Sequence, residues 1–317
     1  MRELVVGVDI GGTLTKLGIV DKQGEVLVQR DFPTKDYQEL SDYLKALVSQ
    51  IDEMKSSIDG DFKLGGVGIG APNANYFRGT IEYAPNLDWK GIVPFVEELK
   101  KLIDLPIKMT NDANAAVIGE KIYGNAKGMN DFMVITLGTG LGSGIVSNGK
   151  LIYGHDAMAG ELGHVVIEEG GRLTGLGRRG GLEAYVSSTG LKRTIFHLLS
   201  DSLAPSPLRD VSFNNLHGEY ITELAEKGDP IATEAYEMTG KLLGKALANF
   251  VTFSHPEAIF LLGGMAKAGK WIFDPTKKHL EENLLPIYQG KVKLLPSGMM
   301  NKNAAVLGAA ALILEEN

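Results

Sequence analysis

The chain has no cysteine among its 317 residues, which excludes a disulfide framework and a cysteine-based zinc site. No apolar stretch reaches the roughly 18 residues that a membrane-spanning helix needs. The N-terminal sequence lacks the apolar region and cleavage site of a signal peptide. Runs of like charge are absent, and the net charge of −7 disfavours attraction to nucleic acid or anionic membranes. We therefore expect a cytoplasmic protein without a nucleic-acid or membrane partner.

Glycine is abundant, with 40 residues, and it is concentrated in three turns that each follow a short, apolar, strand-like run. The three segments are VGVDIGGTLTK (6–16), VITLGTGLGSG (134–144) and IFLLGGMAKAG (259–269). Glycine lets the backbone approach a phosphate closely and aim its N–H groups at it. One such turn is usually a plain hairpin, but three predict a nucleotide that is held from several sides. The P-loop pattern is absent from all three, and the first also lacks the dinucleotide-binding pattern.

Apolar periodicity predicts an α/β fold in two domains. The order of strand, glycine-rich turn and strand near residue 10 recurs near residue 140, which indicates an internal duplication. The segment 71–89 is a long loop rich in Asn, Gly and Pro, and a loop of this length is usually functional. Strands are predicted over 4–10, 16–20, 25–30, 64–70, 106–110, 132–137, 143–146, 151–153, 257–262 and 291–295. Helices are predicted over 40–58, 113–123, 183–199, 218–227, 230–254, 266–284 and 304–314.

The first glycine-rich turn carries an acidic residue at the end of its strand. Asp9 is predicted to bind Mg²⁺ through water beside a triphosphate, since Mg²⁺ prefers one or two carboxylates together with phosphate oxygens. The alternative is an aspartate that only caps the turn. The residues expected to contact phosphates are Gly11, Gly12, Thr13, Thr15 and Lys16. Thr139 with Gly140, and Gly263 with Gly264, would supply further contacts from the other two turns.

Asp112 ends a predicted strand and begins a predicted helix. It is a candidate general base for a substrate hydroxyl, although an aspartate here can equally be a helix N-cap. The neighbouring Asn111 offers both a donor and an acceptor to a sugar hydroxyl. Glu161, His164 and Glu183 make a poor metal set, and in their glycine-rich setting they fit carbohydrate hydroxyls better. A solvated loop is the alternative interpretation of these three residues.

These segments together resemble the ROK family of sugar kinases, within the actin-like ATPase superfamily. The resemblance extends over essentially the whole chain. It is carried by an ordered set of motifs: VDIGGTLTK, GVGIGAPN, YAPNLDW, TNDANAAVIGE, ITLGTGLGSGI, AGELGHVVI, GGLEAYVSSTG and IFLLGGM. As a set, and in this order, the motifs are highly specific.

The resemblance implies a two-domain actin-like ATPase (ribonuclease H-like) fold with a cleft between the domains. We expect a small domain made of 1–112 plus 300–317, and a large domain, 113–299, that holds a homodimer interface. The implied reaction is a glucokinase-like transfer from ATP–Mg²⁺ to a hexose hydroxyl, usually at the 6 position. The implied roles are catalytic base for Asp112; hexose binding for Asn111, Glu161, His164 and Glu183; phosphate binding for Gly11, Gly12, Thr13, Thr139 and Gly140; and adenosine binding for Gly263 and Gly264. Asn73 and Asn86 lie in loops that can approach the sugar in such kinases.

The chain departs from the family at its zinc site. Most members carry one His and three Cys, whereas Thr174, Leu176 and Gly181 stand here at the cysteine positions of TGLGRRGGLE. His164, which is also the usual metal-binding histidine, is retained. We therefore expect no zinc, with local packing holding the loop instead.

Three alternatives remain open from the sequence. The substrate can be N-acetylglucosamine, N-acetylmannosamine, mannose or fructose instead of glucose. A sugar-responsive repressor is disfavoured because the first strand starts at Leu4, which leaves no room for a DNA-binding domain, and because the chain is acidic. A non-catalytic sugar sensor or actin-like assembly protein is disfavoured by the presence of Asp9, Asn111 and Asp112 together.

Overall fold

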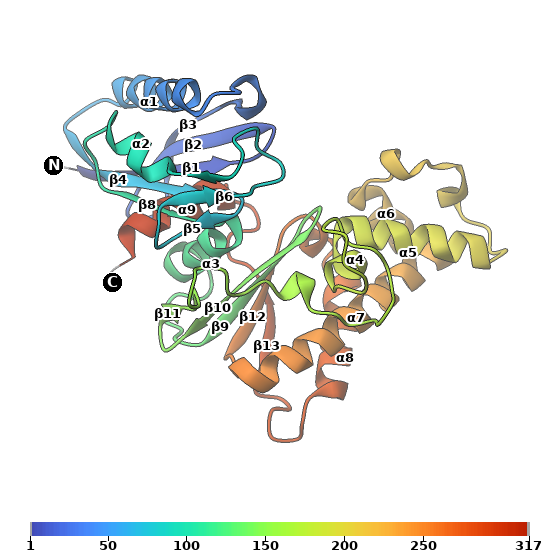
Figure 1. The fold of residues 1–317 in the computed structure, drawn as a ribbon. Helices are drawn as coiled ribbons and strands as arrows, with labels where there is room; N and C mark the ends of the chain where they lie inside the picture. Colours follow the sequence, from blue (N-terminus) through green and yellow to red (C-terminus); the bar gives the residue numbers. More distant parts are fainter. Residues whose placement is uncertain (1, 316–317) are drawn as a thin grey trace. The chain divides into compact units, whose positions relative to one another are not determined.

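The computed structural model describes residues 2–315. The chain forms two compact units (Figure 1). The first contains the residues up to Met129, Leu151–Ala159, and the residues from Asn301 onward; the second contains Asn130–Lys150 and Gly160–Met300. Each unit combines a β-sheet with helices, which confirms the predicted α/β class. In the part of the chain described here, no helix is both long and apolar enough to cross a membrane.

The two units contain sheets of the same topology. The first sheet has the order β3-β2-β1-β4-β8, and the second has the order β11-β10-β9-β12-β13. In both, the central strand pairs antiparallel with the strand that follows it, and parallel with its other neighbour. This shared order supports the duplication inferred from the sequence. The strands are β1 (Arg2–Ile10), β2 (Leu14–Asp21), β3 (Val26–Pro33), β4 (Phe62–Gly70), β8 (Ile107–Thr110), β9 (Phe132–Leu137), β10 (Leu141–Ser147), β11 (Lys150–Leu151), β12 (Ala258–Leu262) and β13 (Lys293–Pro296).

The helices, in chain order, are α1 (Leu40–Ser56), α2 (Phe95–Lys100), α3 (Asp112–Tyr123), α4 (Glu183–Val186), α5 (Ser188–Asp201), α6 (Gly218–Glu226), α7 (Pro230–Ser254), α8 (Lys270–Asn283) and α9 (Ala304–Leu314). Some helices pack on these sheets, and others, such as α5 and α6, pack on α7. Short 3-10 helices are η1 (Thr34–Asp36), η2 (Leu162–His164), η3 (Pro207–Asp210), η4 (Phe213–Asn215) and η5 (Met265–Ala268). The predicted boundary after residue 112 differs from the division into units, because residues 113–129 and Leu151–Ala159 belong to the first unit. Residues 113–129 include helix α3, which packs against α9.

The structure differs from the predicted elements in several places. The expected loop 71–89 contains two strands of a small sheet, β5 (Ala74–Asn75) and β6 (Thr80–Glu82), which β7 (Ile92–Val93) completes. Helix α2 was not predicted. The single helix expected over 183–199 is two helices, because Ser187 is extended and its side chain caps α5 by accepting from the Gly190 N–H.

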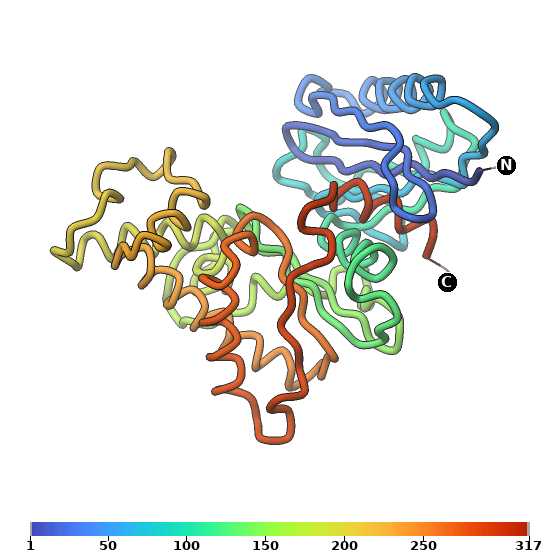
Figure 2. The backbone as a smooth tube through the Cα atoms, turned by 180° about the vertical axis from the view of Figure 1, so that it is seen from behind, coloured from blue at the N-terminus to red at the C-terminus, as the bar shows by residue number. Residues whose placement is uncertain are grey.

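The C-terminal helix α9 packs on the first sheet through glycine. A Cβ at Gly68 would lie 1.9 Å from the Ala309 carbonyl oxygen, and one at Gly7 would lie 2.1 Å from that of Val306. Only a residue without a side chain therefore allows α9 to lie so close to β1 and β4. Figure 2 shows this last segment of the chain returning to the strands of the N-terminal region. The approach fixes the strands whose ends carry the candidate site.

We predict that Gly68→Ala lowers the free energy of unfolding by at least about 2 kcal/mol, because the new methyl group overlaps the backbone of α9. Gly218→Ala is the matched control, since a Cβ at that position meets no atom within 4 Å. Urea denaturation of both variants checks the prediction. Equal stability of the two variants would contradict it.

Candidate active site

The two candidate acidic residues of the first unit lie at the same edge of its sheet. Strands β1, β4 and β8 are parallel neighbours. Asp9 at the end of β1 is paired with Gly70, and Gly70 is paired with Thr110, the last residue of β8. Asn111 and Asp112 follow directly. The carboxyl ends of parallel strands therefore bring Asp9 and Asp112 close enough for their charges to interact.

Asn111, and not Asp112, is the N-cap of α3. Its side-chain oxygen accepts a hydrogen bond of 2.7 Å from the Asn114 N–H. Asp112 is the first helical residue, and its Oδ1 accepts from the Ala113 N–H at 2.8 Å. The interpretation of Asp112 as an N-cap is therefore wrong, because the preceding residue already does this. The Asp112 side chain is exposed, which leaves its carboxylate accessible to a ligand.

Asp9 lies in an electrostatically unfavourable environment. Burial and the nearby charge of Asp112 raise the pKa of the Asp9 carboxyl to about 6. Lys16, its partner across the β1–β2 hairpin, acts in the opposite direction but does not compensate fully. A half-buried carboxylate with an uncompensated negative neighbour attracts a cation.

The turn after Asp9 is in close contact with another loop. A Cβ at Gly12 would lie 2.4 Å from the carbonyl oxygen of Asn86, so glycine is required for this approach. The backbone N–H of Gly11 is bonded to the Leu14 carbonyl at 3.1 Å. Thr13 is exposed, and its carbonyl accepts from the Thr34 N–H at 3.0 Å. Thr13 is thus an exposed residue in a turn whose backbone is fixed.

Thr15 does not face this turn, and its expected contact with phosphate is wrong. The residue is fully buried, and its hydroxyl lies 2.8 Å from both the Thr34 hydroxyl and the Tyr43 hydroxyl. Successive residues of a strand point to opposite faces. Thr15 therefore points into the core, whereas the adjacent Lys16 is exposed.

In the second unit, the turn between β9 and β10 is held by α4 and α5. The side chain of Glu183, the first residue of α4, accepts a hydrogen bond of 2.9 Å from the Leu141 N–H. A Cβ at Gly140 would lie 2.5 Å from the same carboxylate. The hydroxyl of Thr189 donates to the Thr139 carbonyl at 3.0 Å. Glu183 thus links the turn at Thr139 and Gly140 to the helix that carries it.

The third glycine-rich turn lies beside the second. Strands β9 and β12 are parallel neighbours, with Leu262 paired to Thr136. Gly263 follows with a positive φ of 105°, and a Cβ there would lie 2.5 Å from the Leu137 carbonyl oxygen. Gly264 is exposed. The helix expected after this turn begins as the short 3-10 helix η5 and continues as α8. Two of the three glycine-rich turns are therefore adjacent within one unit.

Glu161 directly precedes the short helix η2 and His164 is its last residue, while Glu183 is brought towards them by the base of a loop. The Nε2 atom of His164 lies 3.8 Å from a Glu161 carboxylate oxygen. The Leu182 N–H donates to the Val165 carbonyl at 3.0 Å, which joins the two ends of the segment 165–182. The structure therefore brings all three predicted hexose residues to one region of the second unit.

The residues at the family's zinc positions do not fit zinc. Zinc requires about four nitrogen, sulfur or carboxylate ligands, but the donors here are one imidazole and one hydroxyl. Both His164 Nδ1 and Thr174 Oγ1 are buried without a hydrogen-bond partner. Gly181 lies near both residues. A Cβ placed on Gly181 would lie 3.0 Å from the Thr174 Cγ2 atom and 3.7 Å from the His164 Cα atom. Among residues 2–315 no cluster of three or more His, Asp or Glu side chains could hold a metal.

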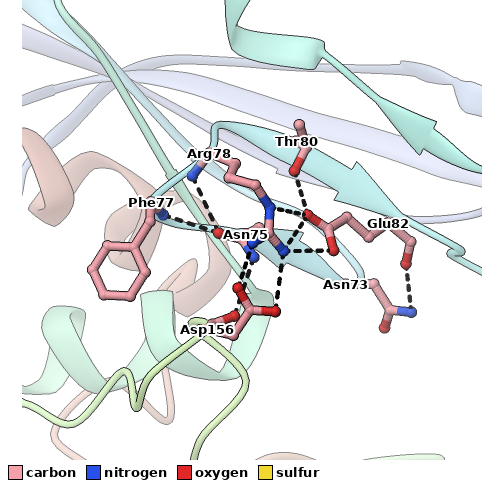
Figure 3. Close-up of polar contacts among 7 residues, drawn as sticks. All are labelled: Asn73, Asn75, Phe77, Arg78, Thr80, Glu82 and Asp156. Carbon is pink, nitrogen blue, oxygen red and sulfur yellow. Dashed lines mark hydrogen bonds and ion pairs between the residues drawn. The ribbon is translucent and has the colours of Figure 1, made fainter.

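Sequence reasoning missed an ionic cluster that fixes the segment before Glu161 (Figure 3). The Arg78 guanidinium bonds Glu82 at 2.8 and 2.9 Å, and it also pairs with Asp156. The Asn75 side chain donates to the Asp156 carbonyl at 3.1 Å. Arg78 lowers the pKa of both carboxyls. These contacts hold Leu151–Ala159 in the first unit.

Stacked aromatic rings strengthen the same attachment. The rings of Tyr76 and Tyr153 are nearly parallel, with centroids 4.1 Å apart. The sequence signal that could have indicated this contact is the pair of aromatic residues Tyr76 and Phe77 within the segment 71–89. Asn73, which was expected in a loop near the sugar, donates to the carbonyls of Glu82 and Tyr83.

The fold and the order of these sites are those of a known family. The model of the ROK family matches residues 5–316. The chain belongs to the ROK family, and its fold is the two-domain actin-like ATPase fold.

Several of its relatives are glucokinases. The glucokinase of Thermotoga maritima is 32% identical over 322 residues, covering 98% of this chain and 97% of the relative. The crystal structure of a ROK family glucokinase from Streptomyces griseus, in complex with glucose and AMPPNP, has a TM-score of 0.80 at 32% identity and covers 98% of both chains. A xylose repressor of Bacillus spizizenii is 28% identical across 98% of this chain and 76% of its own length.

We predict that Asp9→Asn stabilises the protein at neutral pH and not at acidic pH. Because the folded-state pKa of Asp9 is raised to about 6, the native state binds more protons than the unfolded state between about pH 4 and 6. Stability is thus lost as the pH rises through this range. The variant should be more stable than wild type by about 1 to 3 kcal/mol at pH 8, and nearly equal at pH 4.

Urea denaturation at the two pH values measures this difference. The exposed carboxylate of Asp59 provides the control, through Asp59→Asn. A stability gain that is the same at both pH values would show that burial and repulsion of the Asp9 charge are not its cause.

Proposed function

We propose that this protein is an ATP-dependent hexose kinase that transfers the γ-phosphate of ATP to the 6-hydroxyl of glucose or a related hexose. The observation that carries the proposal is the placement of Asp9 and Asp112 at one carboxyl edge, beside a glycine turn of fixed geometry. The glucokinases among the relatives, one of them solved with glucose and AMPPNP, support the same reaction.

Asp112 is the proposed general base. Its exposed carboxylate is held by one hydrogen bond to Ala113, which leaves lone pairs for a sugar hydroxyl. It would accept the proton of the 6-hydroxyl while that oxygen attacks the γ-phosphate in line. The side-chain oxygen of Asn111 is engaged in capping α3, so its amide nitrogen would be the donor to the hexose. Glu161, His164 and Glu183 are the other proposed hexose ligands.

The residues around Asp9 fit a hydrated Mg²⁺. A half-buried carboxylate of raised pKa next to a second carboxylate is stabilised by a divalent cation, which is the chemistry expected of such a site. When bound with ATP, Mg²⁺ neutralises phosphate charge. Gly12 and Thr13 would hold phosphate oxygens through backbone N–H groups and the Thr13 hydroxyl, and Gly11, whose own N–H is bonded to the Leu14 carbonyl, would form the turn that lets phosphate approach. The exposed ammonium of Lys16 would add positive charge.

The two adjacent turns of the second unit are the proposed remainder of the ATP site. Thr139 and Gly140 would contact phosphate, and Gly263 and Gly264 the adenosine. Thr139 and Gly264 are exposed, as ligand contact requires. We further infer that no zinc is bound, because the donor set around His164 does not suit it, and that the protein is a homodimer, as the family resemblance implies.

The substrate alternatives are other hexoses. N-acetylglucosamine, N-acetylmannosamine, mannose and fructose use the same phosphoryl-transfer chemistry and differ only in the groups presented to Glu161 and His164. A non-catalytic sugar sensor is the remote alternative. The xylose repressor among the relatives is the reason to consider a non-catalytic sugar-binding protein. Asp112 is exposed and is not the N-cap of α3, which favours a catalytic role for it.

We predict that Asp112→Asn lowers kcat between about a hundredfold and ten-thousandfold, the usual contribution of a general base. The asparagine oxygen can still accept from the Ala113 N–H, so the melting temperature should stay close to that of wild type. Coupled ADP release with ATP–Mg²⁺ and glucose measures the rate, with the exposed Asp104→Asn as control. Turnover close to wild type would remove Asp112 from the mechanism.

We also predict that activity on glucose is unaffected by a zinc chelator. ADP release should be measured over glucose, mannose, fructose and the two N-acetylated hexosamines, with and without the chelator, at constant Mg²⁺. The glucose rate should be the highest and should not change. ADP release with an N-acetylated sugar alone would indicate an amino-sugar kinase. No ADP release with any of the sugars would favour the non-catalytic sugar sensor.

A further inference from the structure

The segment 165–182 is a long loop that joins two of the proposed hexose ligands, His164 and Glu183. It is closed by two isolated antiparallel bridges, Val166 with Gly181 and Leu173 with Arg179. It contains no regular helix or strand. The conformation of this loop therefore determines how the side chains of His164 and Glu183 are placed relative to a bound sugar.

Core packing does not explain how this loop is held. Val165, Val166, Leu173 and Leu176 are all between 42% and 63% exposed. A cavity of about 950 Å³ lies between the start of the loop and helices α5 and α7. With a cavity on one side and exposed apolar residues along its length, the loop gains little from burial.

Two arginines attach the loop to the helices instead: Arg193 of α5 donates to the Leu173 carbonyl at 2.7 Å, and Arg172 makes the larger set of contacts. The Nη1 atom of Arg172 donates to the Thr194 hydroxyl at 2.9 Å, to the Gly190 carbonyl at 3.1 Å and to the Ala184 carbonyl at 3.3 Å. These acceptors belong to α4 and α5. Each is a neutral oxygen, and bonds from a charged donor to such acceptors are stronger than those between neutral groups.

Tyr185 completes the attachment. Its hydroxyl oxygen accepts from the Arg172 backbone N–H at 2.8 Å, and its ring centroid lies 4.7 Å from the guanidinium carbon. A Cβ at Gly171 would lie only 2.0 Å from the Tyr185 hydroxyl, so glycine is required for this approach. Tyr185 lies two residues after Glu183 in α4. Arg172 therefore fixes the loop against the helix that carries a proposed hexose ligand.

We propose that Arg172 is the positioning residue that holds the hexose-binding loop in its binding conformation, in the role that the family resemblance gives to zinc. The inference rests on the proposed hexose kinase function. Arg172 does not touch the substrate. It acts through Glu183 and His164, by crosslinking the loop between them to α4 and α5.

Arg172→Ala tests this, with Arg178→Ala as the matched control. Arg178 lies in the same loop, and within residues 2–315 its side chain makes no hydrogen bond or ion pair. We expect the Arg172 variant to raise KM for glucose between about tenfold and a hundredfold, to leave KM for ATP near wild type, and to change kcat much less. Arg172→Lys should not restore KM, because a single ammonium cannot reproduce the guanidinium geometry.

Hydrogen exchange of the loop amides gives a readout that is independent of catalysis. In Arg172→Ala the amides of 165–182 should exchange faster than in wild type and in the control, while those of the first unit stay unchanged. This result is expected even if the wild-type protein phosphorylates no hexose, so that failure of the proposed function and failure of the positioning role are distinguishable.

Unchanged glucose KM and unchanged loop exchange in a folded Arg172→Ala protein would overturn the proposal. If that variant does not fold, Thr194→Val replaces it, since it removes one acceptor of Arg172 and leaves the other two. A moderate rise in glucose KM with faster loop exchange is then the expected result, and wild-type values of both would overturn the proposal.

Discussion

The close packing of α9 on the first sheet is the constraint on which the first unit depends. Glycines at positions 7 and 68 let α9 lie directly on β1 and β4, which fixes the strand that carries Asp9. Burial within this framework is the main cause of the raised pKa of the Asp9 carboxyl, and the nearby charge of Asp112 adds to it. A buried carboxylate beside a second acidic group has the chemistry that we propose binds a cation together with ATP.

The second unit has the same strand order, but its strand ends carry different chemistry. The first unit has a glycine-rich turn after β1 and two acidic side chains, Asp9 in β1 and Asp112 after β8, whereas the second has glycine-rich turns after both β9 and β12. These turns offer backbone N–H groups in place of charge. Glu183 is the acidic side chain in contact with one of them, and one of its carboxylate oxygens accepts from the Leu141 N–H. The same topology thus carries different chemistry in the two units, and we propose that the first binds the cation and the second contributes phosphate contacts.

The sequence was sufficient for the features that depend on local pattern. Strands, glycine-rich turns and the position of Asp112 at the end of β8 follow from periodicity and spacing. The alternation of side chains along β2 could also have excluded Thr15 as a phosphate ligand. Thr15 lies on the same face as the apolar Leu17, and both are buried. Arg78 and Arg172 could not be predicted, because their partners lie 78 and up to 22 residues away and are defined only by the folded chain.

The proposed attachment of the loop by Arg172 differs from a zinc site in what the loop depends on. A zinc site of cysteines is lost to chelators and oxidants, because its thiolates must remain deprotonated and reduced. Partial burial lowers the pKa of the Arg172 guanidinium, but an arginine side chain keeps its proton in proteins, and its acceptors here are carbonyls and a hydroxyl that do not titrate at physiological pH. A metal fixes four ligands at short distances, whereas hydrogen bonds of 2.9 to 3.3 Å permit more movement. A loop held in the proposed way would therefore be less rigid than one held by zinc, but its conformation would not depend on metal supply.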